Sequence, residues 1–584
     1  MRDGAAATCP PPGDGVLARI ERQRLIERIR TSVIGDDVLI EGPFGSRRMV
    51  YVDSTASGRA LSFIESFIRD RVLPLYGNTH TEASATGQQT TRLREEARSL
   101  IHAAVGGSDE DVVLFCGSGS TGSIDKLARI VGLGTDGAHR RFAPLDPDER
   151  PVVLVGPYEH HSNELPWRES LADVTTIRAD GDGRIDLAHL EEELERYAQR
   201  PLVIGSFSAA SNVTGIVSDV DSVSIALHRR GALAWWDYAA AGPHLPIDMN
   251  PAPPVPEGHL AYKDAVFLSP HKLAGGPGTP GVLVAKRAQL ERPTPSVPGG
   301  GTILFVSPSG HRYHPDPTIR EEGGTPAIVE SIRAGLVFAL KEAVGADEIR
   351  RREQSLVTRA LLSWGADPCI EILGDATSER LPIVSFGLRH PRGILHSSFV
   401  VSVLSDLFGI QARSGCFCAG PYVHRIYPID EAWSSAMDEE TARGHVGAKL
   451  SLVRVSFDYF MSEAAFRYVV DAVHLLAAEC WRLLPLYRFD PASGVWSHRN
   501  GRSAASLTLR DLSFRAGALL PGASRTAPES VLAAQLEEGR RILRELETAE
   551  PAPPDDPPLD PSFERARWFP LPGEPRGGAN RVAT

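Results

Sequence analysis

The sequence predicts an α/β fold with a mostly parallel sheet in a large domain, followed by a smaller α+β domain. Three observations lead to this prediction. Short apolar runs alternate with helical patterns after residue 50, and long helical patterns alternate with two strands after about residue 326. In addition, 42% of the 584 residues are apolar, which is enough for a large core. Strands that alternate with helices are typical of crossover units and of a sheet buried on both faces.

The predicted strands of the large domain are short apolar runs. They are residues 112–116, 152–155, 201–207, 232–237, 265–269 and 281–286. A helical pattern follows the first of them, with apolar side chains at i, i+3, i+4 and i+7 from Ile124 to Val131. Because parallel sheets bind ligands at the carboxyl ends of their strands, the polar residues that follow these runs are the candidates for a site.

The chain divides into segments that differ in composition and in the pattern of apolar residues. We expect a disordered N-terminus (1–15), an N-terminal segment that packs on the small domain (16–50), a large domain (51–325), a small C-terminal domain (326–485), a tail with one helix (486–550) and a Pro-rich, largely disordered end (551–584). In the small domain the helical patterns 327–344 and 347–364 alternate with strands at 382–388 and 452–458.

The tail contains aromatic residues in otherwise polar stretches. Trp496, Phe514 and Trp568 are too apolar for a wholly solvated tail. We therefore expect the tail up to about residue 550 to pack on the two domains and only 551–561 to stay mobile. The apolar stripe of its helix consists of Leu532, Leu536, Ile542 and Leu543.

Charge and composition argue against several classes of protein. The net charge is −12 and no Lys/Arg cluster stands out, so we expect no nucleic-acid partner. No apolar run reaches the ~18 residues of a membrane span, and residues 1–15 lack the apolar stretch of a signal peptide, so we expect no membrane association and a cytoplasmic location. The six cysteines are too few and scattered for a disulfide framework, and no Cys/His cluster has metal-ligand spacing.

One lysine stands in an unusual setting. In "FLSPHKLAGGPGTPGVLVAKR", residues 267–287, Lys272 follows an apolar run and a Ser-Pro-His triplet and precedes a loop rich in Gly and Pro. Such a lysine is by itself most often a solvated surface residue. Other polar features at strand ends give it a chemical context.

Two of these features follow predicted strands of the first half of the sheet. In "CGSGST", Cys116–Thr121, small residues let backbone N–H groups close on an anion at a helix N-terminus, although a plain strand–helix turn is an equal alternative. In "YEHHSNELPW", His160 and His161 are either packing residues or metal ligands. Neighbouring residues of an extended chain point opposite ways, so at most one histidine faces the sheet end, and metal binding is the weaker interpretation.

Two more features carry a carboxylate and a thiol. Asp237 in "WWDYAAAGPH" closes an apolar strand, where a carboxylate is costly unless it is paired, for example with a protonated ring nitrogen. In "RSGCFCAGPY" a cysteine lies among small residues near Arg413, and a nearby arginine favours the nucleophilic thiolate. The alternative for this cysteine is a small buried apolar residue.

A lysine, an anion cradle, an aspartate and a histidine together suit one cofactor. Pyridoxal 5′-phosphate (PLP) needs a lysine for its Schiff base, an acidic partner for its ring nitrogen and a pocket for its phosphate. Lys272, Asp237 and the Cys116–Thr121 loop match these needs. The glycines after Lys272 are then expected to let the backbone lie close to the cofactor.

With these motifs in order, the sequence resembles the class V PLP-dependent enzymes, which have the fold of the fold-type I transferases, and among them the cysteine desulfurase and selenocysteine lyase branch. The likeness runs from "YVDSTASGRA" (51–60) to "LVRVSFDYFMSEAAF" (452–466). Two strings, "YGNTHT" and "GCFCAG", are locally similar to the N-terminal domain of molybdenum-cofactor sulfurases.

The resemblance implies a role for each residue that matches a family motif. Lys272 is the Schiff-base lysine, His160 stacks on the ring and transfers protons, and Cys418 accepts the sulfur. The implied cofactor contacts are Ser120, Thr121, Ser269 and His271 at the phosphate, Asn212 at the phenolic oxygen and Asp237 at the ring nitrogen. Thr325 in "GGTP" matches a residue that reaches the phosphate from the other subunit, which implies a homodimer. Arg454 matches the arginine that binds the substrate carboxylate, and Arg413 lies near the substrate.

The resemblance also has departures. Ala240 stands where the family has a Gln or Ser that donates to the phenolic oxygen, and Cys416 stands where many desulfurases have a histidine. The implied function is removal of sulfur from cysteine, or from a related thiol or selenol amino acid, with alanine and a Cys418 persulfide as products. A sulfur-acceptor protein is a candidate partner. The alternatives are a class V aminotransferase, a C–S lyase or epimerase in which Cys418 is idle, and a PLP-binding scaffold without turnover.

Overall fold

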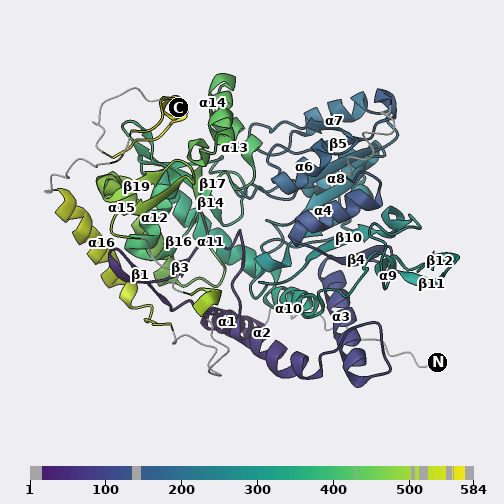
Figure 1. The fold of residues 1–584 in the computed structure, drawn as a ribbon. Helices are drawn as coiled ribbons and strands as arrows, with labels where there is room; N and C mark the ends of the chain where they lie inside the picture. Colours follow the sequence, from purple (N-terminus) through teal and green to yellow (C-terminus); the bar gives the residue numbers. More distant parts are fainter. Residues whose placement is uncertain are drawn as a thin grey trace.

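The structure is a computed structural model that describes residues 16–134, 146–427, 429–501, 507–511, 524–547, 556 and 558–572. A large α/β body and a smaller α+β body lie side by side (Figure 1). The expected disordered N-terminus (1–15), Phe514 and most of the segment 551–561 lie outside the described residues. Within the described ranges, none of the helices combines the length and the hydrophobicity needed to cross a bilayer.

The large body is built on a seven-stranded sheet. Its strand order is β4 (Asp111–Cys116), β10 (Gly281–Lys286), β9 (Ala265–Leu268), β8 (Leu233–Asp237), β7 (Val203–Ser208), β5 (Val152–Val155) and β6 (Asp173–Thr176). The strands from β9 to β6 are parallel, which confirms the mostly parallel sheet. The polar edge strand β6 was not predicted, because its sequence DVTT has no apolar run.

Strand β10 is antiparallel to both of its neighbours, β9 and β4. Residues 269–280 connect it to β9 and contain only the 3₁₀ turn Pro270–Lys272, whereas a parallel connection usually crosses over through an α-helix. Because β4 is in turn antiparallel to β10, it runs in the same direction as β9. The carboxyl ends of β4, β5, β7, β8 and β9 therefore lie at one edge of the sheet.

Both faces of this sheet are apolar, and alternate residues of each strand belong to different clusters. Trp235 packs with α4 (Gly119–Ile130) on one face, whereas Trp236 joins the large cluster on the other face, and both side chains are 0% exposed. Helices α3 (Ala85–Ala104) and α10 (Ile328–Val344) pack against each other. This burial explains the nearly continuous apolar runs by which the strands were predicted.

The small body contains an antiparallel sheet in the order β13 (Ile370–Ile372), β14 (Ile383–His390), β18 (Leu452–Ser456) and β17 (Arg413–Gly415). Its main helices are α11 (Ala346–Gly365), α12 (Ser397–Phe408) and α15 (Glu463–Glu479). The N-terminal segment contacts this body at several points, among them a strand pairing and a hydrogen bond. Strand β3 (Val50–Tyr51) pairs with β16 (Ile410–Gln411), and Arg30 of α1 (Val16–Thr31) donates to the Phe460 carbonyl oxygen at 2.6 Å.

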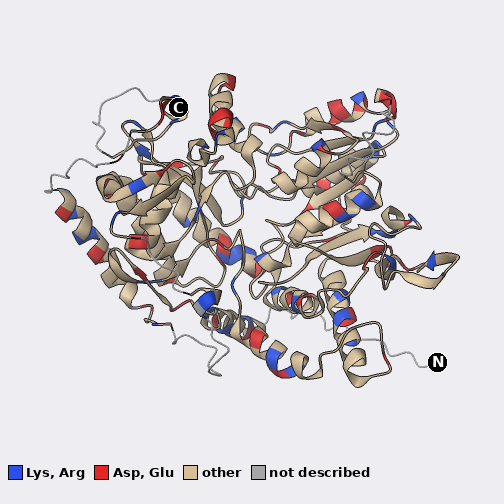
Figure 2. Ribbon diagram, in the orientation of Figure 1, with Lys and Arg blue, Asp and Glu red and all other residues tan. Residues whose placement is uncertain are grey.

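The tail packs on the small body. Strands β19 (Tyr487–Asp490) and β20 (Val495–His498) form a hairpin, and helix α16 (Val531–Glu547) lies against α15 and α12. Leu532 and Leu543 are each 2% exposed, and Gly539 lies so close to α12 that a Cβ there would be 2.4 Å from Phe408. Figure 2 marks acidic and basic residues along the ribbon of α16, as expected for an amphipathic helix with one apolar and one charged side.

Part of the segment 551–584, which was predicted to be largely disordered, is ordered in the structure. Residues 558–572 are described and include helix α17 (Pro561–Ala566). Phe563, Trp568 and Phe569 are at most 3% exposed, and the Trp568 ring stacks on His396 with centroids 5.3 Å apart. Each buried aromatic side chain removes ~150–250 Å² from water, and this offsets the cost of ordering a proline-rich segment.

Replacement of Leu543 by alanine tests the packing of α16. Because the side chain is 2% exposed, Leu543→Ala is expected to lower the free energy of unfolding by about 2–5 kcal/mol and to lower the urea midpoint. The control is Leu362→Ala in α11, where the leucine is 72% exposed and the expected change is within about 0.5 kcal/mol. Equal midpoints for the two variants would show that α16 does not pack on α12 and α15 in solution.

Candidate active site

A cavity of about 240 Å³ lies at the carboxyl edge of the main sheet, where residues of both bodies meet. Its lining includes Ser120, Thr121, His160, Asn212, Asp237, Ser269, His271, Lys272, Arg413, Cys418 and Arg454. These are all the predicted site residues except Thr325. The Thr325 side chain lies elsewhere in this chain and accepts a hydrogen bond from Asn78 Nδ2 at 3.3 Å.

The loop between β4 and α4 forms one end of the cavity. Gly119 has φ +54°, and a Cβ at this position would lie 2.8 Å from His271 Cε1 and 2.9 Å from Ser269 Oγ. The Ser120 N–H donates to Ser269 Oγ at 2.8 Å, and Thr121 Oγ1 lies 2.7 Å from Ser162 Oγ. The glycine therefore leaves room at a helix N-terminus surrounded by hydroxyl groups, which is the donor set that a phosphate prefers.

Asp237 closes β8 and is 4% exposed. Its Oδ1 accepts a hydrogen bond from the Ala239 N–H at 2.8 Å. Burial raises the pKa of the Asp237 carboxyl, and the nearby Lys272 ammonium opposes this rise. A second buried positive charge against this carboxylate would therefore stabilise its ionised form.

Lys272 lies in a 3₁₀ turn, Pro270–Lys272, directly after β9. Burial lowers the pKa of its amine to about 8, although the Asp237 carboxylate acts in the opposite direction. His271 is also partly buried, and this burial, together with the Lys272 charge, lowers the pKa of His271 to about 4. At neutral pH His271 is therefore uncharged, and a substantial fraction of Lys272 loses its proton only slightly above neutrality.

The glycines after Lys272 do not line the cavity, and their proximity to a cofactor stays a prediction. A Cβ at Gly276 would be 2.0 Å from the Pro270 carbonyl oxygen, and one at Gly281 would be 2.0 Å from the Gly119 carbonyl oxygen. These glycines let the loop pack against the protein's own backbone. The close contact between Gly281 and Gly119 holds β10 beside the anion cradle.

The two adjacent histidines face different surroundings. His160 lines the cavity, and its Nδ1 accepts the Ser162 N–H at 3.1 Å, which leaves the proton of the neutral ring on Nε2. Burial, with a contribution from Lys272, lowers the pKa of His160 to about 4. His161 faces the segment Cys416–Gly420, where its Nε2 accepts the Gly420 N–H at 3.0 Å. No group of three or more His, Cys, Asp or Glu side chains in the described part of the chain is arranged to hold a metal ion.

Both arginines of the site contact Asp53, a residue that the sequence analysis missed. Arg454 Nη2 donates to Asp53 Oδ1 at 3.1 Å, and Arg413 Nε donates to Asp53 Oδ2 at 2.8 Å. Arg454 is 3% exposed and also donates to the Asn212 carbonyl oxygen at 3.0 Å. Asp53 follows the apolar residues of β3, so the rule that identified Asp237, a carboxylate after a strand, applies to it as well.

Cys418 lies in a strained turn that spans Cys416–Ala419. Phe417 has φ +53° and Cys418 has φ +55°, and the Ala419 N–H donates to the Cys416 carbonyl oxygen at 3.0 Å. Positive φ at both central positions is the pattern of a type I′ turn, which normally requires Gly or Asn. Each non-glycine residue in this conformation costs ~1–3 kcal/mol, so neighbouring groups must hold the turn.

The groups that hold this turn come from the large body and from β18. Asn212 Nδ2 donates to the Phe417 carbonyl oxygen at 2.8 Å, and the His161 N–H donates to that of Cys418 at 2.6 Å. The Arg454 guanidinium lies 4.6 Å from the centre of the Phe417 ring. The Cys418 residue itself stays exposed at the cavity wall.

Glu159 is a second residue that the sequence analysis missed. Its carboxylate is 3% exposed and accepts hydrogen bonds from the Ser208 N–H at 2.8 Å and from Asn163 Nδ2 at 2.6 Å. Burial raises its pKa to about 7, against the effect of these donors. Glu159 thus connects the strand end that carries His160 to the end of β7, beside Asp237.

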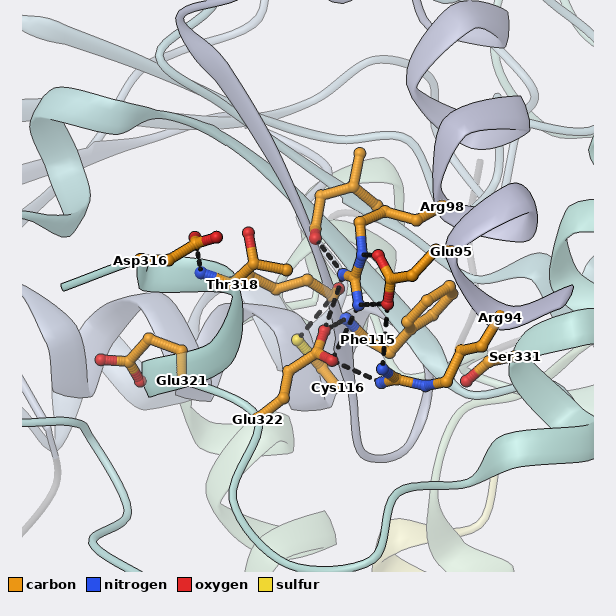
Figure 3. A network of polar contacts seen from close by, with 12 residues as sticks. Arg94, Glu95, Arg98, Phe115, Cys116, Asp316, Thr318, Glu321, Glu322 and Ser331 are labelled. Carbon is orange, nitrogen blue, oxygen red and sulfur yellow. Dashed lines mark hydrogen bonds and ion pairs between the residues drawn. The ribbon is translucent and has the colours of Figure 1, made fainter. Parts of the chain in front are cut away.

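A network around Glu322 anchors the segment that carries Thr325 (Figure 3). The Glu322 carboxylate accepts from Arg98 Nη1 at 3.0 Å and from the Phe115 N–H of β4 at 2.6 Å, and it pairs with Arg94. Burial alone would raise the pKa of Glu322, but Arg98 and Arg94 hold it below its usual value. The neighbouring Glu321 pairs with Lys126 of α4 at 3.3 Å. The two glutamates therefore fix this segment to the strand and the helix that flank the anion cradle.

The residues around the cavity fit PLP. The cradle at Gly119 has the space and the donors for a phosphate, and the buried Asp237 carboxylate lacks a permanent positive partner other than Lys272 among the described residues. The Lys272 amine lines the same cavity and has a lowered pKa. Ala240 also lines it, so no polar side chain is present where the family has a Gln or Ser.

Comparison with known proteins gives the same result. The family description "Aminotransferase class-V" matches residues 50–466. A probable cysteine desulfurase of Streptomyces coelicolor is 27% identical over 379 residues, which are 64% of this chain and 84% of the relative. One of Halalkalibacterium halodurans is 29% identical over 377 residues, again 64% of this chain and 84% of the relative.

Solved structures share the fold. A cysteine desulfurase from Thermococcus onnurineus superposes with a TM-score of 0.58 at 23% identity and covers 74% of this chain and 94% of its own. One from Escherichia coli has a TM-score of 0.55 at 22% identity and covers 73% and 93%. The resemblance to class V PLP enzymes is thereby confirmed, whereas the local likeness to molybdenum-cofactor sulfurases stays a prediction.

The family match covers well over half of the chain, from the strand β3 that precedes Asp53 to the start of α15. It includes every residue of the cavity lining. The chain therefore belongs to the class-V aminotransferase family of PLP-dependent enzymes.

Proposed function

We propose that this chain is a cysteine desulfurase-like enzyme that removes sulfur from cysteine, or from a related thiol or selenol amino acid, and takes it up on Cys418. The observation that carries this proposal is that Cys418 and Lys272 line one cavity whose wall also contains Arg454. When bound, PLP supplies an electron sink for the carbanion that forms at the substrate α-carbon. The relatives named above support the same activity.

Each residue of the cavity has its own role in the reaction. Lys272 would hold PLP through Nζ, and its free amine, with a pKa of about 8, is suited to take the α-proton of the substrate. Asp237 would pair with the ring nitrogen, and His160 would contact the cofactor from the cavity wall. The Ser120, Thr121, Ser269 and His271 side chains would hold the phosphate.

Sulfur transfer is a displacement at the substrate sulfur. The Cys418 thiolate attacks this sulfur, the carbon–sulfur bond breaks, and the carbon keeps the electron pair and takes up a proton, which yields alanine. Cys418 is left as a persulfide, so no external oxidant or reductant is needed. Arg454, which Asp53 holds in place, and Arg413 bind the substrate carboxylate.

The position of Thr325 supports a homodimer. Thr325 lies outside the cavity of its own chain, and its segment is fixed by Glu321, which pairs with Lys126, and by the contacts of Glu322 (Figure 3). The adjacent hairpin, β11 (Ile303–Ser307) and β12 (Gly310–Tyr313), extends from the large body (Figure 1) with Phe305 64% exposed. An exposed apolar hairpin of this kind is typical of an interface.

The pH dependence of PLP incorporation tests Lys272. Only the neutral amine reacts, so in the PLP-free protein the rate is expected to rise as the pH rises through about 8 and then to level off. Asp237→Asn removes the carboxylate that raises this pKa, and its profile should therefore move to lower pH. Lys272→Ala should form no covalent link at any pH. A borohydride-stable adduct on another lysine would contradict the assignment.

Replacement of Cys418 tests the chemistry. Cys418→Ser should bind PLP and cysteine normally but form alanine at least about 100-fold more slowly, because a hydroxyl group is not ionised at neutral pH. The control is Cys369→Ser, a partly buried cysteine next to β13, which should keep the full rate. Pyruvate in place of alanine from the unchanged protein would indicate a C–S lyase, and binding without any product would indicate a scaffold.

Sedimentation of the PLP-loaded protein tests the dimer. The expected result is one species of twice the chain mass, because obligate interfaces bury ~2,000 Å² or more and do not dissociate at micromolar concentration. Phe305→Glu should produce monomers that take up PLP less tightly. A PLP-loaded monomer of the unchanged chain would refute the role of Thr325.

A further inference from the structure

A second cavity, of about 510 Å³, lies behind the strained turn Cys416–Ala419. Residues of α13 (Gly420–Ile426) and α14 (Glu431–Ala442) form much of its lining, together with Cys416, His161, Lys449 and Leu450. No residue lines both this cavity and the one that contains Lys272. A volume of ~300–1,000 Å³ is usual for a small-molecule site.

Two short chain segments separate the two cavities. In the first, His160 lines the active-site cavity and His161 lines the second cavity. In the second, Phe417 and Cys418 line the active-site cavity and Cys416 lines the second cavity. The His161 N–H donates to the Cys418 carbonyl oxygen, and the Gly420 N–H donates to His161 Nε2. These two hydrogen bonds join the segments into one wall.

Each face of this wall thus carries one cysteine. The turn has a hydrogen bond between its ends, Cys416 and Ala419, so its Cα atoms lie close together. Cysteines whose Cα atoms are ~4.4–6.8 Å apart can bring their sulfur atoms into contact, and residues i and i+2 of a tight turn fall in this range. The two cysteines are therefore close enough for a sulfur atom to pass between them when their side chains, and the strained turn that carries them, reorient.

We propose that Cys416 takes the sulfur from Cys418 and delivers it to a small thiol bound in the second cavity. The Cys416 thiolate attacks the outer sulfur of the Cys418 persulfide, a new sulfur–sulfur bond forms, and Cys418 leaves as a thiolate. The acceptor thiolate then attacks the outer sulfur on Cys416 in the same way and leaves as a persulfide. Both steps are thiol–persulfide exchanges without net oxidation. This inference rests on the proposed desulfurase function.

The lining of the second cavity suits a thiolate. Burial lowers the pKa values of His161 and His424, so both rings are neutral near pH 7 and can donate a hydrogen bond to sulfur. Lys449 lies close enough to His161 to lower its pKa further, and it is the cation of the lining. The opposing carboxylate, Asp438, lies on the exposed part of α14. The sulfur leaves through this cavity, while substrate enters on the Lys272 side.

The test follows sulfur in the holoenzyme. The enzyme is mixed with cysteine alone, alkylated, and analysed by peptide mass for an extra sulfur on Cys416 or Cys418, and alanine is measured in the same sample. In a second arm, dithiothreitol is added as the acceptor and sulfide release is measured. We expect the extra sulfur on both cysteines of the unchanged chain. In Cys416→Ser we expect it on Cys418 alone, with a full single turnover of alanine and at least about 10-fold slower sulfide release.

A second pair of variants tests the cavity without altering a cysteine. Ser435 lines the cavity from an exposed position of α14, so Ser435→Trp should fill it and slow sulfide release while alanine formation in a single turnover stays intact. Ala432→Trp, exposed on the same helix but outside the lining, should leave both unchanged.

The outcomes separate the two proposals. Absence of alanine from the unchanged chain overturns the desulfurase function and this inference together. Alanine with the extra sulfur on Cys418 only, and normal sulfide release from Cys416→Ser, overturns the relay alone. Normal release from Ser435→Trp overturns the second cavity as the exit.

Discussion

The shared direction of β5, β7, β8 and β9 puts their carboxyl ends at one edge, and the site depends on this arrangement. The register pairs Ser208 with Asp237 and Asp237 with Phe267, two residues before Ser269. A parallel sheet needs apolar cover on both faces. Trp235 and Trp236, which are buried on opposite faces, show that this sheet is covered on both. Polar groups can then gather only at the strand ends, where Asp237 and Lys272 are buried deeply enough for their pKa values to shift.

Polar contacts between the two bodies hold the other wall of the site. Asp53 joins Arg413 and Arg454, and Asn212 and His161 hold the carbonyl groups of the strained turn. The strain of Phe417 and Cys418 costs ~1–3 kcal/mol for each residue, and these contacts offset it. The position of the Cys418 thiol is therefore coupled to how closely the small body approaches the large one.

The sequence was sufficient for features that depend on local pattern. The alternation of strands and helices predicted the parallel sheet, and a polar residue after an apolar run identified Asp237 and Lys272. Arg454 was found through the resemblance, because nothing local distinguishes it. The small residues and Arg413 around the Cys416–Cys418 pair were a local signal, but only the resemblance chose Cys418 from the pair. The direction of β10 depends on loop length, and the roles of Asp53 and Glu159 depend on partners far away in the chain. The packing of residues 558–572 depends on an aromatic cluster assembled from four separate segments, which no periodicity reveals.

The contact between Trp568 and His396 has a consequence for biosynthesis. His396 is the N-cap of α12, a central helix of the small body, and its ring is covered by Trp568 and Phe569. A nascent chain folds from its N-terminus as it leaves the ribosome, so the large body can form while these two aromatic residues are still unmade. A chain that ends before Trp568 leaves the His396 end of α12 without this cover, although the rest of the helix is packed by other elements.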